Sequence, residues 1–203
     1  MNLLFLLSLV GLAFFVLNKR DQSVRIALLG SYLGKFHIEK LMETVIDGYM
    51  RALGESNAER QAQVWGMLSS AEHTLCEQFN AFAHEFAKVP EEASRVSALS
   101  IALPYATKLL AGATFDMREA LLLHARGIEA VAQDTTLAQK DKAFRLTAEL
   151  FLMQHTCHWF CRSKTIASAR MVARHKTPYA QLVASVSPAT RQAYVALLAG
   201  KRP

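Results

Sequence analysis

The sequence predicts an all-α protein, with one N-terminal transmembrane helix followed by a bundle of about seven helices. An apolar run without charge opens the chain, and only nine Gly and five Pro are spread over 203 residues. Apolar residues then recur three or four positions apart along nearly all of the remaining chain, which is the spacing of amphipathic helices. No stretch alternates well enough to predict a strand, and no repeat of 20–50 residues is visible.

The apolar run extends from Leu3 to Leu17 and is too apolar on every side for an ordinary surface helix. Its fifteen residues would span about 22 Å as a helix, against roughly 30 Å for the hydrocarbon core of a bilayer. Met1, Asn2, Asn18 and local thinning of the bilayer would complete the span. The side chains expected to contact lipid are Leu3, Leu4, Phe5, Leu6, Leu7, Val10, Leu12, Phe14, Phe15, Val16 and Leu17.

A cleaved secretory signal and a buried helix of a soluble protein are the alternatives to this anchor. A signal peptide carries positive side chains before its apolar region and a small-x-small cleavage site after it. Here Lys19 and Arg20 follow the run, and no Ala-x-Ala is present. Basic flanks remain in the cytoplasm. We therefore expect residues 1–20 to be a single-pass inner-membrane anchor with its N-terminus outside, and residues 21–203 to be a cytoplasmic helical domain. Three cysteines, which do not resemble a disulfide framework, agree with a reducing compartment.

The first half of the domain is expected to contain three helices. The first covers residues 23–53, ends at Gly54 and continues from the anchor without a strong breaker, which allows one long rod. A capping-box pattern at residues 56–59 opens the second, whose apolar stripe includes Phe79, Phe82 and Phe86. We read that aromatic stripe as core. The third begins at Pro90, with a kink at Pro104, and runs to about residue 110.

The second half is expected to contain four helices. Residues 116–119 form another capping-box candidate, which begins a helix to about Gln133. The longest apolar pattern follows, over residues 137–175. Thr177-Pro178 and Ser187-Pro188 each resemble an N-cap followed by proline at the first helical position, and they begin two short helices, the last ending at Gly200.

Charge is distributed unevenly along the chain. The net charge is +6, yet residues 150–203 contain eight Lys or Arg and no Asp or Glu. Such a step suggests that the C-terminal quarter faces something anionic. An anionic lipid surface and an acidic protein partner are both consistent with it, as is a solvated face paired with acids of other helices. Nucleic acid is disfavoured, because no recognition motif is visible. The residues expected to face an anionic surface or partner are Arg162, Lys164, Arg170, Arg174 and Lys176.

Two His-x-x-Cys pairs suggest an alternative with bound zinc, although no metal or cofactor is our primary expectation. His73 and Cys76 form one pair, and His158 and Cys161 form the other. On facing helices they could supply a tetrahedral Cys2His2 site. The apolar stripe of the second domain helix turns His73 toward solvent, however, which favours core thiols and surface histidines instead. No C-x-x-C-H haem motif and no Glu-x-x-His di-iron motif is present.

No motif for catalysis is present. The sequence contains no G-x-S-x-G and no glycine-rich phosphate loop, so no catalytic residue is predicted. An anchor, a helical domain and a one-sided charge distribution favour a non-enzymatic interaction module, an adaptor or subunit of a larger membrane assembly. Its expected partners are the lipid bilayer and at least one protein. A zinc-binding bundle and an enzyme with an unrecognisable site remain the alternatives.

Overall fold

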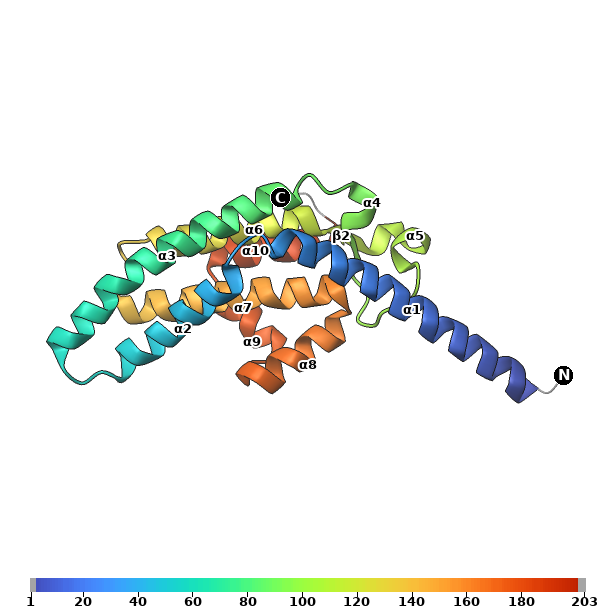
Figure 1. Ribbon diagram of the computed structural model, residues 1–203, viewed down its shortest axis with the longest axis horizontal. Coiled ribbons are helices and arrows are strands. Elements are labelled where there is room, and N and C mark those ends of the chain that lie inside the picture. Colours follow the sequence, from blue (N-terminus) through green and yellow to red (C-terminus); the bar gives the residue numbers. More distant parts are fainter. Residues whose placement is uncertain (1–2, 201–203) are drawn as a thin grey trace.

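The computed structural model describes residues 3–200 and is mostly helical, which confirms the all-α prediction (Figure 1). The described chain contains two short strands, β1 (Arg95–Ser97) and β2 (Thr114–Asp116), and one 3-10 turn, η1 (Ala111–Ala113). Its α-helices are α1 (Leu3–Leu33), α2 (Ile38–Gly54), α3 (Ala58–Phe86), α4 (Glu91–Ser94), α5 (Ala106–Leu109), α6 (Met117–Gln133), α7 (Gln139–Cys161), α8 (Lys164–His175), α9 (Tyr179–Ser185) and α10 (Pro188–Leu198).

Helix α1 has two different halves. Every side chain from Leu3 to Leu17 is exposed, and this half projects away from the other helices (Figure 1). The first buried side chain is Gln22, and Leu29 is buried about two turns further along the same face. Within residues 3–200, α1 is the one helix whose length and composition would suit a membrane span.

The expected rod from the anchor into the domain is confirmed as far as Leu33, but the expected single helix over residues 23–53 is wrong. The chain leaves the helix at Gly34, whose amide still bonds to the Gly30 carbonyl, and α2 begins only at Ile38. Two overlapping turns that both contain Gly34 therefore replace the expected continuous helix. Helices α2 and α3 then form a hairpin, and Asn57 caps α3 by accepting a hydrogen bond from the Arg60 amide at 3.0 Å.

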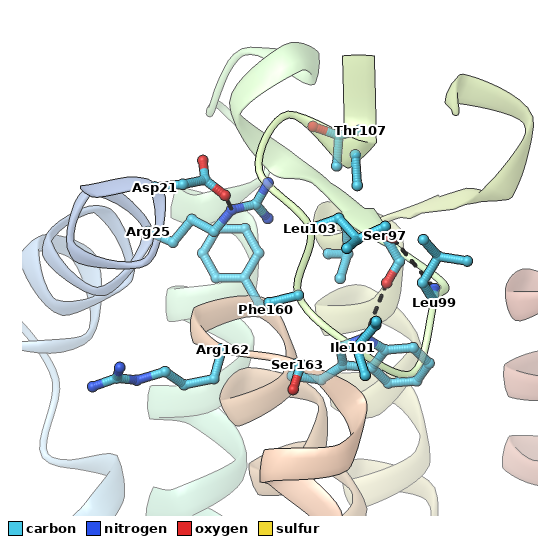
Figure 2. A pocket seen from close by; sticks show the side chains of 14 residues that line it. Asp21, Arg25, Ser97, Leu99, Ile101, Leu103, Thr107, Phe160, Arg162 and Ser163 are labelled. Carbon is cyan, nitrogen blue, oxygen red and sulfur yellow. Dashed lines mark hydrogen bonds and ion pairs between the residues drawn. The ribbon is translucent and has the colours of Figure 1, made fainter. Parts of the chain in front are cut away.

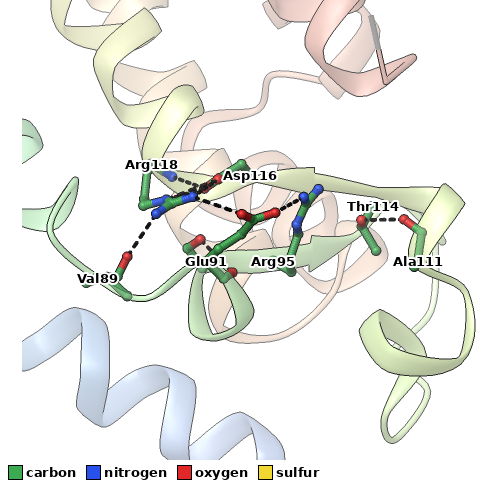
Figure 3. A network of polar contacts seen from close by, with 8 residues as sticks. Val89, Glu91, Arg95, Ala111, Thr114, Asp116 and Arg118 are labelled. Carbon is green, nitrogen blue, oxygen red and sulfur yellow. Dashed lines mark hydrogen bonds and ion pairs between the residues drawn. The ribbon is translucent and has the colours of Figure 1, made fainter. Parts of the chain in front are cut away.

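The predicted helix over residues 90–110 is wrong. Only α4 and α5, four residues each, are helical there, and β1 pairs with β2 in antiparallel register, Val96 opposite Phe115. A polar network stabilises the base of this hairpin (Figure 3). The Arg118 guanidinium donates to the Asp116 carboxylate at 2.6 Å and to the Val89 carbonyl at 3.1 Å, while Glu91 pairs with Arg95.

The longest predicted helix is divided in two. Helix α7 ends at Cys161, and Ser163 caps α8 by accepting from the Ile166 amide at 3.3 Å. The break lets α8 turn back beside α7. Helix α7 packs against α1, α2, α6, α8 and α9. Of the two terminal helices, α10 begins at Pro188 as predicted, with Ser187 as its cap accepting from the Thr190 amide. Helix α9 begins one residue later than predicted, at Tyr179, because Pro178 takes the N-cap position expected for Thr177.

Candidate functional site

A groove follows one side of α7, with α1 and α2 forming one wall and α8 the other. It consists of two adjoining hollows, of about 1020 Å³ and about 550 Å³, which share seven lining residues. These shared residues are Gly30, Leu33, Glu39, Met42, Gln154, His158 and Arg170. The two hollows are therefore one continuous groove, which we call the α7 groove. The smaller hollow alone has the size of a small-molecule cleft, and the whole groove is larger than the roughly 300–1,000 Å³ typical of such clefts.

The floor of the smaller hollow of the α7 groove is largely apolar. Leu29 comes from α1, Met42 from α2, Phe82 from α3, and Met153 and Cys157 from α7, and all five line the smaller hollow. Methionine and cysteine side chains are polarisable, and methionine is flexible, so that such a surface adapts to differently shaped apolar partners. This floor suits an apolar side-chain stripe.

The two rims of the groove carry opposite charge. Along α2, the exposed residues Glu39, Glu43 and Asp47 follow one another at four-residue spacing, which places them on one side of the helix. The exposed Lys40 lines the same hollow, so this rim is acidic in net charge. Along α8, the exposed residues Arg170 and Arg174 repeat the same spacing. Within residues 3–200, no ion pair joins the two rims. The charges therefore remain available to a molecule in the groove.

The α8 end of the groove is held in place by contacts with α7. The His175 ring stacks on Phe151 with 3.9 Å between ring centroids, and His175 Nε2 lies 3.2 Å from Gln154 Oε1. On the floor, burial and then the nearby Arg170 and Arg174 lower the pKa of His158 to about 4. His158 is therefore neutral at pH 7 and presents a hydrogen-bonding ring rather than a charge.

The five basic residues singled out in the sequence do not form one patch. Arg162, Arg170 and Arg174 line the groove, and Arg162 donates to Gln22 of α1 at 2.6 Å. Lys164 lies over the rings of Trp159 and Tyr179, at 5.1 and 4.7 Å from their centroids. Lys176, at the end of α8, is exposed outside the groove. Two further basic residues of this quarter, Lys201 and Arg202, lie outside the described residues.

The structure does not bring the two His-x-x-Cys pairs together. His73 is exposed and pairs with Glu77 on its own helix at 3.3 Å, whereas Cys76 is buried. His158 and Cys161 line the α7 groove. Across the described part of the chain, no group of three or more His, Cys, Asp or Glu is placed to hold a metal ion. Burial also raises the pKa of both Cys76 and Cys161 to about 11, which disfavours the thiolate that zinc requires.

The opposite side of α7 carries a polar cluster that is sealed from solvent. Thr156, His124 of α6 and Tyr194 of α10 are all fully buried. The Thr156 hydroxyl donates to the Leu152 carbonyl and lies 2.9 Å from His124 Nε2 and 3.2 Å from the Tyr194 hydroxyl. Burial, and then the nearby His155, lowers the pKa of His124 to about 3. These three side chains are enclosed by α6, α7 and α10 and take part in the packing of the core.

The acidic rim is the part of the groove that the sequence interpretation missed. Its signal is present in the sequence as acids at positions 39, 43 and 47, matched by basic residues at 170 and 174. Nothing in the sequence shows that these two segments face the same groove, because they are far apart in the chain. The charge step at residue 150 indicates only the basic rim.

Comparisons of the chain with models of protein families, with curated proteins and with solved structures give no match.

Proposed function

We propose that this protein is a membrane-anchored, non-enzymatic interaction module whose α7 groove binds an amphipathic helix of a partner protein. The observation that carries the proposal is the apolar floor between two rims of opposite charge. A helix-in-groove complex uses the apolar stripe of the ligand helix for affinity and its flanking residues for specificity. In the α7 groove, the acidic rim would face one flank of the ligand helix and the basic rim would face the other.

The dimensions of the groove agree with a helical ligand. Between Phe151 and Cys161, the groove-lining part of α7 is about 15 Å long at 1.5 Å per residue. That length accommodates three turns of a second helix. The expected ligand helix carries basic residues on the flank that faces Glu39, Glu43 and Asp47, and acidic residues on the flank that faces Arg170 and Arg174. Reversing its direction would place like charges together, so the rims also define its orientation.

The position of the groove supports a partner at the membrane. One wall is the packed half of α1, the same helix whose exposed half is the expected anchor. Leu29, in the floor, follows Leu17 by a distance of about 18 Å along the helix axis. A partner helix in the groove would therefore lie close to the bilayer surface, on the side where Lys19 and Arg20 remain. This arrangement suits an adaptor or subunit of a membrane assembly.

Photo-crosslinking from single positions of the full-length protein in its native membrane tests this proposal. A photoreactive residue replaces Glu43 or Ile166, which lie on opposite sides of the groove, or Met67 as a control on the exposed surface of α3. We expect both groove positions to crosslink one defined protein through an amphipathic helix, and Met67 not to crosslink it. Adducts with lipid alone, or the same products from all three positions, would contradict the proposal.

Charge reversal tests the orientation of the bound helix. Arg170→Glu combined with Arg174→Glu is expected to abolish the groove crosslinks, and complementary reversal of the acidic residues in the partner helix is expected to restore them. Lys176→Glu is the matched control, since Lys176 is exposed beside the end of the same helix but does not line the groove. Loss of the crosslinks in the Lys176 variant as well would show that net charge, not groove recognition, governs binding.

A further inference from the structure

The segment between β1 and β2 presents a group of exposed apolar side chains. We call residues 98–113 the hairpin loop. In it, Ile101 is 60% exposed, Tyr105 51%, Leu109 77% and Leu110 45%. A contiguous group of exposed large apolar residues marks a surface that another molecule or a membrane covers. These four residues lie within ten positions of the chain, around the four-residue helix α5.

The hairpin loop is held firmly against the helical domain. The Trp159 indole donates to the Ser97 carbonyl at 3.0 Å, at one end of the loop. Both the amide and the hydroxyl of Thr165, at the start of α8, donate to the Ser100 carbonyl at 3.0 and 2.7 Å. The β1–β2 pairing and the Arg118–Asp116 network close its base (Figure 3). The exposed apolar side chains are thus displayed by an ordered structure.

The hairpin loop lies beside α1 just after the apolar run ends. A small pocket of about 30 Å³ is lined on one side by Asp21 and Arg25 of α1 and on the other by Ile101, Leu103 and neighbouring loop residues (Figure 2). The Arg25 guanidinium also donates to the Arg95 carbonyl at 3.0 Å. Asp21 and Arg25 follow Leu17 by about 6 and 12 Å along the helix axis. Figure 1 shows α5 at the end of the domain from which α1 projects.

The character of the loop residues matches a membrane interface. Tyr105 has a φ of 58°, in the left-handed region that bulky residues rarely adopt, so the fold holds this aromatic side chain outward against its backbone preference. Tyrosine is enriched at the headgroup level of membranes. Lys108 is exposed beside Leu109, where an anionic leaflet would attract it together with Lys19 and Arg20.

We propose that the hairpin loop is a second membrane contact, with Ile101, Tyr105, Leu109 and Leu110 inserted at the headgroup–acyl boundary of the leaflet from which α1 emerges. The inference rests on the proposed anchoring of α1. A single helix would leave the domain free to rotate about the helix axis, whereas a second point of contact fixes that rotation. It thereby also fixes the direction in which the α7 groove opens relative to the bilayer surface.

Quenching by the bilayer tests this contact in the full-length protein. The protein is reconstituted into vesicles of phosphatidylcholine and phosphatidylglycerol that carry bromine on their acyl chains. Three variants each add one tryptophan to the native Trp65 and Trp159: Phe14→Trp in the apolar run, Leu109→Trp in the hairpin loop, and Met67→Trp on the exposed surface of α3. Quenching is measured relative to the parent protein in the same vesicles.

We expect strong additional quenching for Phe14→Trp, clear additional quenching for Leu109→Trp, and none for Met67→Trp. Quenching at position 14 without quenching at position 109 would overturn the loop contact and leave the anchor intact. A blue-shifted but unquenched emission at position 109 would also overturn it, because a protein surface then covers the loop. No quenching at position 14 would overturn the anchor, and the proposed function with it.

Discussion

The two sides of helix α7 contrast a sealed surface with an open one. Lys142, Glu149 and Thr156 follow one another at seven-residue spacing, so they share one side of the helix, and Glu149 and Thr156 are fully buried. Gln154 and His158 lie on the other side and line the α7 groove. Polar side chains are present on both sides. What separates the two is access to solvent: neighbouring helices enclose the polar groups of one side, whereas the charged rims on the other side are exposed.

On the sealed side, partners come from other helices. Glu72 of α3 accepts from Tyr49 and from Lys142, each at 2.6 Å, and Ser187 donates its amide to Glu149 at 2.9 Å. On the open side, the arginines of one rim and the carboxylates of the other form no ion pair with each other within the described residues. Buried polar groups are normally hydrogen-bonded within the fold, whereas an exposed charge without an internal partner is available for binding.

Removing the buried ammonium should have the largest effect. Lys142→Met keeps most of the aliphatic stem but leaves the Glu72 carboxylate, with a side chain 6% exposed, without its cation. We expect the free energy of unfolding to fall by about 3–5 kcal/mol, as is typical when one partner of a buried ion pair is removed. Denaturant unfolding of the purified full-length protein measures this loss in the free energy of unfolding.

The control for this prediction is an exposed ion pair. Lys88 and Glu85 are neighbours on the surface, with side chains 68% and 42% exposed. Lys88→Met should therefore lower the free energy of unfolding far less than Lys142→Met does, because solvent screens the exposed pair. Equal losses for the two methionine variants would show that the Glu72–Lys142 pair is not protected from solvent.

The hydroxyl at the centre of the sealed cluster should have the next largest effect. Thr156→Val preserves the shape of the side chain but leaves the buried His124 Nε2 and the Tyr194 hydroxyl without this partner. The expected loss of unfolding free energy is about 2–3 kcal/mol. Thr44→Val is the matched control, because Thr44 also donates to the carbonyl four residues before it but is exposed. Thr44→Val is expected to lower the free energy of unfolding by less than about 0.5 kcal/mol.

The parts of the fold that the sequence predicted depend on local signals. These signals are the apolar run, the Phe79–Phe82–Phe86 stripe and the prolines at 178 and 188. Each signal consists of a few neighbouring residues, and each helix that it predicts is present. The helix ends at Leu33 and Cys161 carry weaker signals. At Ser163, an ordinary N-cap residue lies inside a strong apolar pattern, which by itself predicts a helix that continues.

The remaining features depend on contacts between distant residues. The hairpin over residues 95–116 requires Arg118 to reach Val89 and Trp159 to reach Ser97, which no local pattern indicates. The α7 groove likewise requires residues 39–47 and 170–174 to face each other. The spacing of the charges along the chain places each rim on one side of its own helix. Only the packing of α1, α2 and α8 around α7 brings the two rims together.

Acid should destabilise the protein through its buried histidines. Burial lowers the pKa of His124 to about 3 and that of His155 to about 4, whereas an unfolded histidine has a pKa of about 6.5. The unfolded chain therefore takes up protons that the folded chain excludes as the pH falls from about 6.5 to about 4. Each histidine should lower the free energy of unfolding by about 1.4 kcal/mol per pH unit in this window.

Comparing variants isolates this contribution. His124→Gln should reduce the slope of unfolding free energy against pH by about one proton relative to the parent protein. Burial raises the pKa of Glu149, which acts in the opposite direction over the lower part of the window, so each variant is compared with the parent at the same pH. An unchanged slope in the His124 variant would mean that its ring is accessible to protons in the folded state.

The smallest effect on stability is expected on the open side of α7. Arg170 and Arg174 are exposed and have no carboxylate partner among the described residues, so Arg170→Ala with Arg174→Ala should change the free energy of unfolding by less than about 0.5 kcal/mol. The same pair of substitutions should nevertheless weaken partner crosslinking from Ile166, and the residual binding should be less sensitive to salt, because fewer charges remain to be screened. A loss of stability comparable to that of Lys142→Met would mean that these arginines support the fold, and the contrast between the two sides of α7 would then disappear.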